Sequence, residues 1–125
     1  MERGSAWSRL KTSLTQTATQ HEAQELREDT ERVGATPIDQ LGDRQVVDVC
    51  GSVRSVTLPP KASVPTLVVE LYDGSRPLNL VWLGRRSIGG IAPGTFLKAH
   101  GRVTRVRGIP TIYNPTYTIV PNRGR

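Results

Sequence analysis

The sequence has one cysteine, few aromatic side chains and no long hydrophobic run. A lone Cys50 excludes an internal disulfide and also a zinc site built from several thiolates. No apolar stretch approaches the roughly 20 residues of a transmembrane helix, and the first residues lack the apolar core of a signal peptide. We therefore expect a soluble cytoplasmic protein that makes no contact with a membrane and holds Cys50 as a buried structural thiol.

Acidic residues are scarce after residue 43. Residues 44–125 hold twelve Lys and Arg but only three acids, which gives this part a net charge of +9. Residues 1–43 hold eight acids and five Lys and Arg, a net charge of −3. A basic excess on about 80 residues favours a polyanionic partner, of which nucleic acid is the commonest. A charged surface that only maintains solubility is the alternative.

Patterns for catalysis and for metal binding are also missing. His100 is the single histidine after residue 43. The three acids there, Asp48, Glu70 and Asp73, are not spaced as an acid pair or as a metal site. The glycines form no phosphate-binding loop. We therefore expect no enzyme activity, no metal ion and no cofactor.

The first 36 residues differ in pattern from the rest of the chain. Residues 5–33 contain neither proline nor glycine, and Trp7, Leu10 and Leu14 follow a helical spacing that then fades. A helix that is polar all round is marginal alone and needs a surface to pack against. We expect a loosely attached helical or partly disordered extension. Its alternatives are docking on the following domain, contact with a protein partner, or an acidic half that covers the basic surface.

Residues 37–121 alternate with a period of two, which predicts an all-β domain. Gly51 indicates a bulge or bend in the first strand, and Pro110 and Pro115 interrupt the last one. The connector at 84–94 is too rich in glycine for more than one short helical turn. Five strands are expected, at 47–58, 66–72, 78–83, 96–106 and 109–120.

The order of these strands predicts a five-stranded Greek-key OB-fold barrel. A long first strand can serve both sides of a closed sheet. A hairpin follows it, and a long connector leads to a second hairpin. An SH3-like barrel also has five short strands, but the long first strand and the long connector favour the OB-fold. The predicted organisation is a polar helical extension at 1–36, a barrel at 37–121 and a basic tail at 122–125.

Several short motifs resemble nucleic-acid-binding OB domains. They are Val47-Asp48-Val49-Cys50-Gly51-Ser52-Val53, Leu71-Tyr72-Asp73-Gly74 and the stretch from Pro93 to Val103. Ile112-Tyr113-Asn114-Pro115-Thr116-Tyr117 resembles the closing strand of the wedge OB domain in RecG-type helicases, although that family often has His where Asn114 stands and an acid where Thr116 stands. The whole chain resembles small stand-alone OB-fold proteins of actinobacteria. The resemblance covers residues 37–121 and implies a grip on nucleic acid without a motor.

OB-folds bind on the sheet around the second and third strands, between the loops that join strands one to two and four to five. A cationic groove holds the backbone of a single strand, and aromatic side chains stack on its bases. Alternation should place Lys98 and Arg102 on one face of their strand, with His100 between them. The predicted nucleic-acid-binding residues are Arg54, Tyr72, Arg76, Trp82, Arg85, Arg86, Lys98, Arg102, Arg105, Arg107 and Tyr113.

The aromatic side chains leave alternatives open. Trp82 shares a strand face with two leucines, so it fits the core as well as a stacking role. Tyr113 fits a stacking role or a plug at the end of the barrel. Tyr72 is expected to be exposed, and Tyr117 is expected to be buried.

The favoured function is non-enzymatic binding of single-stranded or structured DNA with low sequence specificity. RNA binding by the same face is an alternative, with DNA favoured over RNA. A second alternative is a protein-interaction module that serves as a subunit or adaptor of a larger assembly, with a protein partner held by the N-terminal helix. Localisation in the cytoplasm, including the nucleoid, agrees with the favoured function.

Overall fold

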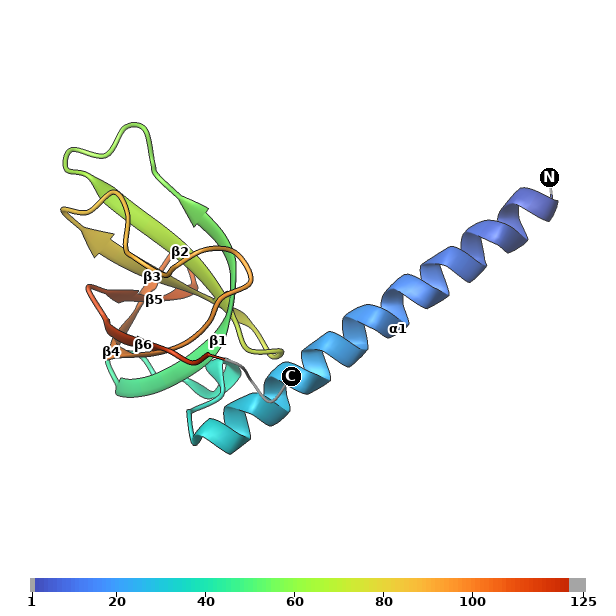
Figure 1. Cartoon of the computed structure of the whole chain (residues 1–125), viewed down its shortest axis with the longest axis horizontal. Coiled ribbons are helices and arrows are strands. Elements are labelled where there is room, and N and C mark those ends of the chain that lie inside the picture. Colours follow the sequence, from blue (N-terminus) through green and yellow to red (C-terminus); the bar gives the residue numbers. More distant parts are fainter. Residues whose placement is uncertain (1, 122–125) are drawn as a thin grey trace.

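The computed structural model describes residues 2–121, with side chains described from Thr17 onward. One long helix precedes a sheet of six strands (Figure 1). The predicted strands at 66–72 and 96–106 are confirmed at both ends. The elements in chain order are α1 (Glu2–Val33), the short 3-10 helix η1 (Ile38–Gln40), β1 (Val46–Thr57), β2 (Thr66–Tyr72), β3 (Pro77–Leu83), β4 (Phe96–Val106), β5 (Ile109–Tyr113) and β6 (Thr116–Ile119).

The strand β1 connects the two halves of the sheet. Residues 46–52 pair antiparallel with β4, and residues 52–57 pair antiparallel with β2. A Cβ atom at Gly51 would stand 2.5 Å from the carbonyl oxygen of Tyr72, so the close approach of β2 requires glycine there. Of the bulge or bend expected at Gly51, the bulge lies elsewhere, because the register shift falls between Val53 and Ser55, while β1 changes its partner from β4 to β2 at Ser52, next to Gly51.

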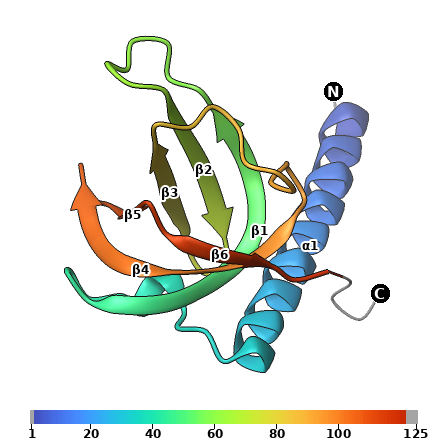
Figure 2. The same ribbon diagram turned by 60° about the vertical axis from the view of Figure 1, so that its left-hand side comes forward.

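Five strands form a closed ring of hydrogen-bonded neighbours, in the order β1-β2-β3-β5-β4 and back to β1 (Figure 2). The ring closes where β3 pairs parallel with β5, while the other neighbours pair antiparallel. The strand β6 pairs with β4 beyond the end of β5. The predicted single strand at 109–120 is therefore two strands, because Asn114 adopts a left-handed φ of 50° and Pro115 has no N–H to donate.

The core lies inside the ring and follows the alternation of the strands. Inward side chains pair across β2 and β3, as Leu67 with Trp82, Val69 with Leu80, and Leu71 with Leu78. Other strands complete this cluster with Val49, Val53, Leu97, Val103 and Ile112. All of these side chains are buried, and removal of their apolar surface from water is the main stabilising contribution to the fold.

The helix α1 packs its last turns against the outside of the ring, while its first turns project away (Figure 1). Leu26 is buried with Cys50 of β1 and Phe96 of β4 in a second, smaller core. Burial raises the pKa of the Cys50 thiol, whose Sγ lies 3.6 Å from Thr30 Oγ1. The helix thus shares buried contacts with the ring, in place of the loose attachment expected from its polar sequence. No helix in the described part of the chain is long and apolar enough to cross a membrane.

Candidate nucleic-acid interface

The side chains of β2, β3 and β5 that point away from the core form the outer face, in which Val81 and Thr111 are themselves buried. The register places one row across four strands, made of Thr57, Val68, Val81 and Tyr113. The next row contains Ser55, Glu70, Asn79, Thr111 and Thr104. The outer face therefore offers an aromatic ring, hydroxyl groups, an amide and a single carboxylate.

Tyr113 lies at one end of the outer face and is 46% exposed. Its position is fixed by Asn114, whose N–H donates to the Val81 carbonyl at 2.6 Å. The Asn114 Oδ1 also accepts the Leu83 N–H at 2.9 Å. These bonds hold the Tyr113 ring outside the core, so it does not plug the ring of strands. Its exposed face is available for stacking on a base.

The opposite end of the outer face, here called the closed end, is covered by α1. The guanidinium carbon of Arg54 lies 4.5 Å from the centre of the Tyr72 ring, and Arg54 Nη2 lies 2.6 Å from Glu22 Oε1 of α1. The Tyr72 hydroxyl donates to the Gly74 carbonyl at 3.2 Å, and Arg27 Nε donates to the same carbonyl. Tyr72 is half-buried and its ring already carries a cation, so it is less exposed than expected.

Trp82 belongs to the core and not to the outer face. Its side chain is 5% exposed, and its Nε1–H donates to the Pro115 carbonyl at 3.2 Å. Its ring meets Tyr117 edge to face, with centroids 5.7 Å apart. Of the two alternatives for Trp82, the core role is the one that the structure shows, and we leave this residue out of the interface. Tyr117 is partly buried against the core.

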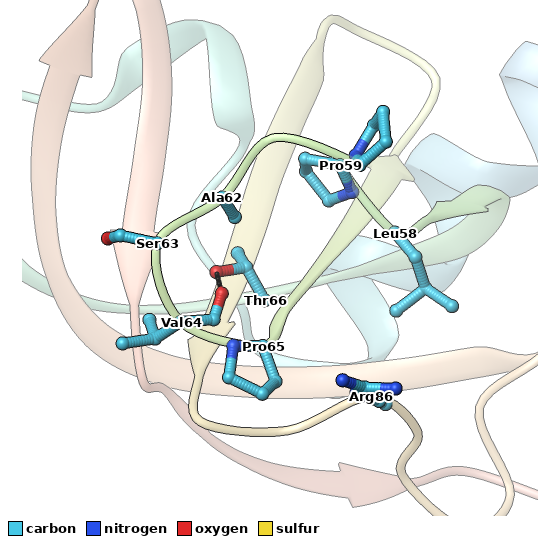
Figure 3. A pocket seen from close by; sticks show the side chains of 9 residues that line it. Leu58, Pro59, Ala62, Ser63, Val64, Pro65, Thr66 and Arg86 are labelled. Atoms are coloured by element: carbon cyan, nitrogen blue, oxygen red, sulfur yellow. Dashed lines mark hydrogen bonds between the residues drawn. The ribbon is translucent and has the colours of Figure 1, made fainter.

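The loop between β1 and β2 forms a pocket with the connector that follows β3 (Figure 3). The pocket has a volume of about 350 Å³, and its lining includes Leu58, Pro59, Pro60, Ala62, Ser63, Val64, Pro65 and Thr66. Arg86 lines it as well, near Leu58 and Pro65 in the view of Figure 3. The Gly84 N–H donates to the Pro65 carbonyl at 2.6 Å, which ties the loop to the end of β3. Arg85 and Arg86 are exposed, so positive charge borders this pocket.

Lys98, His100 and Arg102 point outward from β4, as the alternation predicts, but they do not share one environment. The strand β4 pairs with β6 as far as His100 and with β5 from Val103 onward. Lys98 and His100 therefore lie beside β6, where His100 Nδ1 is 2.9 Å from Asp48 Oδ1. Only Arg102 lies at the β5 side, where the outer face ends.

Arg102 and Arg105 both bond to the segment that precedes β1 and contains Arg44, and Arg107 follows in the turn between β4 and β5. The Arg44 N–H donates to the Val103 carbonyl at 2.7 Å, and Arg102 Nη1 donates to the Arg44 carbonyl at 2.6 Å. Arg105 Nη2 donates to the Leu41 carbonyl at 3.1 Å. Sequence analysis missed Arg44, because it precedes the first strand and alternation gives no direction for its side chain. We call this group the arginine edge: Arg44, Arg102, Arg105 and Arg107.

The positive charge of the ring is largely uncompensated. Residues 44–121 hold ten Lys and Arg, and among the described residues only Arg54 of these forms an ion pair. Asp73 is 1% exposed, with a carboxylate that accepts backbone N–H groups in and near the turn that carries the exposed Arg76. Asp48 pairs with His100. Glu70, in the middle of the outer face, is the remaining acid of the ring.

Comparison with known proteins bears on this fold. No family model and no curated protein matches the sequence. A structure of RecG bound to a three-way DNA junction is similar to 71% of this chain, with a TM-score of 0.59 and 19% sequence identity. A crystal structure of the p204 HINb domain is similar to 72% of this chain, with a TM-score of 0.56 and 16% identity. A replication protein A heterotrimer bound to single-stranded DNA matches 70% of this chain and 73% of its own, with a TM-score of 0.49 and 10% identity.

The first two similarities show that the ring has the OB-like fold of nucleic-acid-binding domains. The resemblance predicted from the sequence is confirmed at the level of the fold. This chain spans 13% of the RecG chain and 49% of the HINb chain. At identities of 19% and 16%, the shared property is the arrangement of the strands.

Proposed function

We propose that this protein binds single-stranded or structured DNA through the outer face and the basic residues around it, with low sequence specificity and without catalysing a reaction. The observation that carries the proposal is exposed positive charge without carboxylate partners, placed around one face of an OB-like ring. A cationic surface with an exposed aromatic ring is how such folds hold a single strand. In this arrangement Arg86, Arg102 and Arg105 contact phosphates, and Tyr113 stacks on a base.

Phosphate contacts supply most of the expected affinity. Tyr113 is the exposed aromatic side chain on the described outer face, and one stacked base contributes about 1–3 kcal/mol. Glu70 at the centre repels phosphate, so the backbone is expected to follow the basic edges while the bases lie over the hydroxyl and amide groups. Contacts to the backbone carry no sequence information by themselves, which supports low sequence specificity.

DNA is the favoured polymer. Of the similar structures, the RecG structure is bound to a three-way DNA junction. The hydroxyl groups of Ser55, Thr57 and Thr104 on or beside the outer face are also able to bond a ribose 2′-hydroxyl. RNA is therefore compared directly with DNA in the test below.

A protein-interaction module is the second candidate, and one observation favours it. The first turns of α1 project away from the ring (Figure 1). Trp7, Leu10 and Leu14 could contact a protein partner there, and their side chains lie outside the described residues. The two functions are compatible, because α1 pairs with the ring at the closed end, through Glu22 and Arg54.

Fluorescence anisotropy with the full chain tests the proposal. Labelled single-stranded DNA, single-stranded RNA, duplex DNA and a three-way DNA junction are compared across a salt series. We expect micromolar or tighter binding that weakens steeply as salt rises, strongest for single-stranded or junction DNA. A shortened chain is unsuitable, because removal of residues 1–36 also removes Leu26 from the second core.

Two multiply substituted variants show which surface is responsible for the binding. Changing Arg85, Arg86, Arg102 and Arg105 together to Ala should abolish most of the binding. Changing Trp7, Leu10 and Leu14 together to Ala should leave DNA binding intact and remove only a protein partner. Absence of binding to every probe at low salt would contradict the proposal and favour the protein-interaction module.

A further inference from the structure

The arginine edge is held together by backbone carbonyls and not by carboxylates. Arg102 donates to the Arg44 carbonyl at 2.6 Å, and Arg105 donates to the Leu41 carbonyl at 3.1 Å. None of the four arginines forms an ion pair with a described residue, including Asp43, the neighbour of Arg44 in the chain. Each guanidinium has five N–H donors, so one bond to a carbonyl orients it and leaves its charge and most of its donors free.

Two of these arginines also occupy a backbone conformation that disfavours them. Arg44 has a φ of 65° and Arg107 a φ of 53°, in the left-handed region where a side chain crowds the following carbonyl. Arg107 precedes Gly108 in the hairpin turn, a position where Asn or Gly is preferred.

The one other non-glycine residue with positive φ in the described chain is Asn114. Its conformation has a local reason, because its side chain accepts the Leu83 N–H at 2.9 Å. The described contacts give the side chains of Arg44 and Arg107 no such bond. At Arg107 the two-residue hairpin turn itself requires a positive φ, whereas no described side-chain bond accounts for the positive φ of Arg44, and strain of that kind is often found at functional sites.

We infer that the arginine edge is a phosphate-binding site that grips the sugar-phosphate backbone of DNA. Two guanidinium groups are oriented in advance by carbonyls, so they lose little side-chain freedom when they bind phosphate oxygens. Arg44 and Arg107 keep an unfavourable backbone because the site needs their charge at the turn. The arginine edge follows β4 beside the outer face: Arg102 lies near Tyr113, and Arg105 and Arg107 lie further along β4, toward the row of Pro77 and Tyr72. A strand whose base meets Tyr113 therefore meets Arg102 first. The inference rests on the proposed function. It adds Arg44 to the proposed binding residues and assigns phosphate binding to the turn that carries Arg107.

Substitution by glycine separates binding from folding at these two positions. Arg44→Gly and Arg107→Gly each remove one guanidinium and relieve the left-handed strain, and Arg44→Gly preserves the carbonyl that holds Arg102. We expect the Tm of each variant to be unchanged or higher, because glycine adopts positive φ without a steric clash. Binding should weaken at the same time. Lys61→Gly, which removes one charge from the exposed loop between β1 and β2, is the matched control.

The probe is labelled single-stranded DNA, measured by anisotropy across a salt series, with Tm measured by thermal unfolding. Each lost phosphate contact should reduce the slope of log K against log salt by about 0.7, which corresponds to roughly fivefold weaker binding at 0.1 M salt. Lys61→Gly should change the slope by less than half of that amount. Binding loss without a fall in Tm would support the inference.

Four results would overturn it, and the last three are distinguishable from failure of the proposed function. If the wild-type protein bound no nucleic acid, both the proposed function and the inference about the arginine edge would be wrong. If Arg44→Gly and Arg107→Gly bound DNA as tightly as the wild-type protein, only the inference about the arginine edge would be wrong. Equal weakening by Lys61→Gly would show that net charge, and not this cluster, determines affinity. A fall in Tm for both arginine variants would show that these side chains stabilise the fold.

Discussion

Arg54 and Arg102 belong to the same ring of strands but lie in opposite electrostatic surroundings. Arg54 lies over the Tyr72 ring and pairs with Glu22 of α1 at 2.6 Å. Arg102 donates to the backbone carbonyl of Arg44, also at 2.6 Å. A carboxylate neutralises the guanidinium that it orients, whereas a carbonyl orients it and leaves its charge in place. The helix therefore closes one end of the outer face, and the arginine edge stays open to a polyanion.

This comparison explains how an acidic segment and a basic ring coexist in one chain. Among the acids of α1, Glu22 pairs with Arg54 of the ring. Asp29 pairs with Arg32 on the helix itself, and Glu25 pairs with His21. The hypothesis that the acidic half covers the basic surface therefore holds for one ion pair, and most of the ring's charge remains available for binding.

The largest effect is expected on the free energy of unfolding, and it concerns the contact between α1 and the ring. Leu26 is buried between α1 and the ring, so Leu26→Ala should lower the free energy of unfolding by about 2–5 kcal/mol. Leu83, 48% exposed at the end of β3, provides the matched control. Leu83→Ala should change the same quantity by no more than about 0.5 kcal/mol. Chemical denaturation measures both, and equal effects would mean that α1 is not part of the folded core.

The next effect contrasts the two tyrosines of the interface. Tyr113→Ala should weaken binding to single-stranded DNA by about 1–3 kcal/mol, the contribution of one stacked base, with no fall in Tm. Tyr72→Ala should mainly lower Tm, because the Tyr72 ring packs against the second core and under Arg54. Anisotropy and thermal unfolding of both variants provide the comparison. Full affinity in Tyr113→Ala would remove stacking from the proposed binding mode.

A smaller effect is expected from the two arginines themselves. Arg102→Ala should weaken DNA binding about fivefold at 0.1 M salt, the effect of one lost phosphate contact. Arg54→Ala should change affinity by no more than about twofold, because Glu22 already offsets its charge. The measurement is anisotropy at several salt concentrations. A larger loss of DNA affinity for Arg54→Ala than for Arg102→Ala would contradict the assignment of DNA binding to the arginine edge and not to the closed end.

The smallest effect is expected from the ion pair at the closed end. Glu22→Gln removes the carboxylate that pairs with Arg54 and should strengthen DNA binding about twofold, since an exposed ion pair contributes roughly 0.2–1 kcal/mol. Glu28→Gln, at an exposed helix position without a contact to the ring, is the control of equal charge. An equal gain in both variants would indicate a general charge effect and not the release of Arg54.

The sequence predicted the ring well where alternation is unbroken. Strands β2 and β4 begin and end where the periodicity of two begins and ends. The prediction failed where a backbone angle determines the local structure. The left-handed φ of Asn114 divides the last strand in two, and the left-handed φ of Arg44 determines the path of the chain just before β1. Periodicity carries no information on such angles. It also gave no reason to place Gly51 under the Tyr72 carbonyl, a contact between strands that is visible only after folding.

The candidate site was predicted less completely than the fold. The basic residues were identified by charge, but only the structure separates Lys98, beside β6, from Arg102 at the arginine edge. Trp82 and Tyr113 have similar sequence surroundings, and the difference between 5% and 46% exposure arises from which strand face meets the core. The docking of α1 was only one of several alternatives, because Leu26 is an isolated apolar residue among charged neighbours.

The double partnership of β1 has a consequence for how the chain folds. Residues 46–57 bond to β2 shortly after them and to β4, which follows about forty residues later. Neither half of the sheet can be completed without this strand, so no half-formed ring should accumulate at equilibrium and unfolding should be cooperative. Such distant pairings also slow folding, because a long stretch of chain must be ordered before they form. In native-state hydrogen exchange, the amide protons in the middle of β1 should therefore be among the last to exchange.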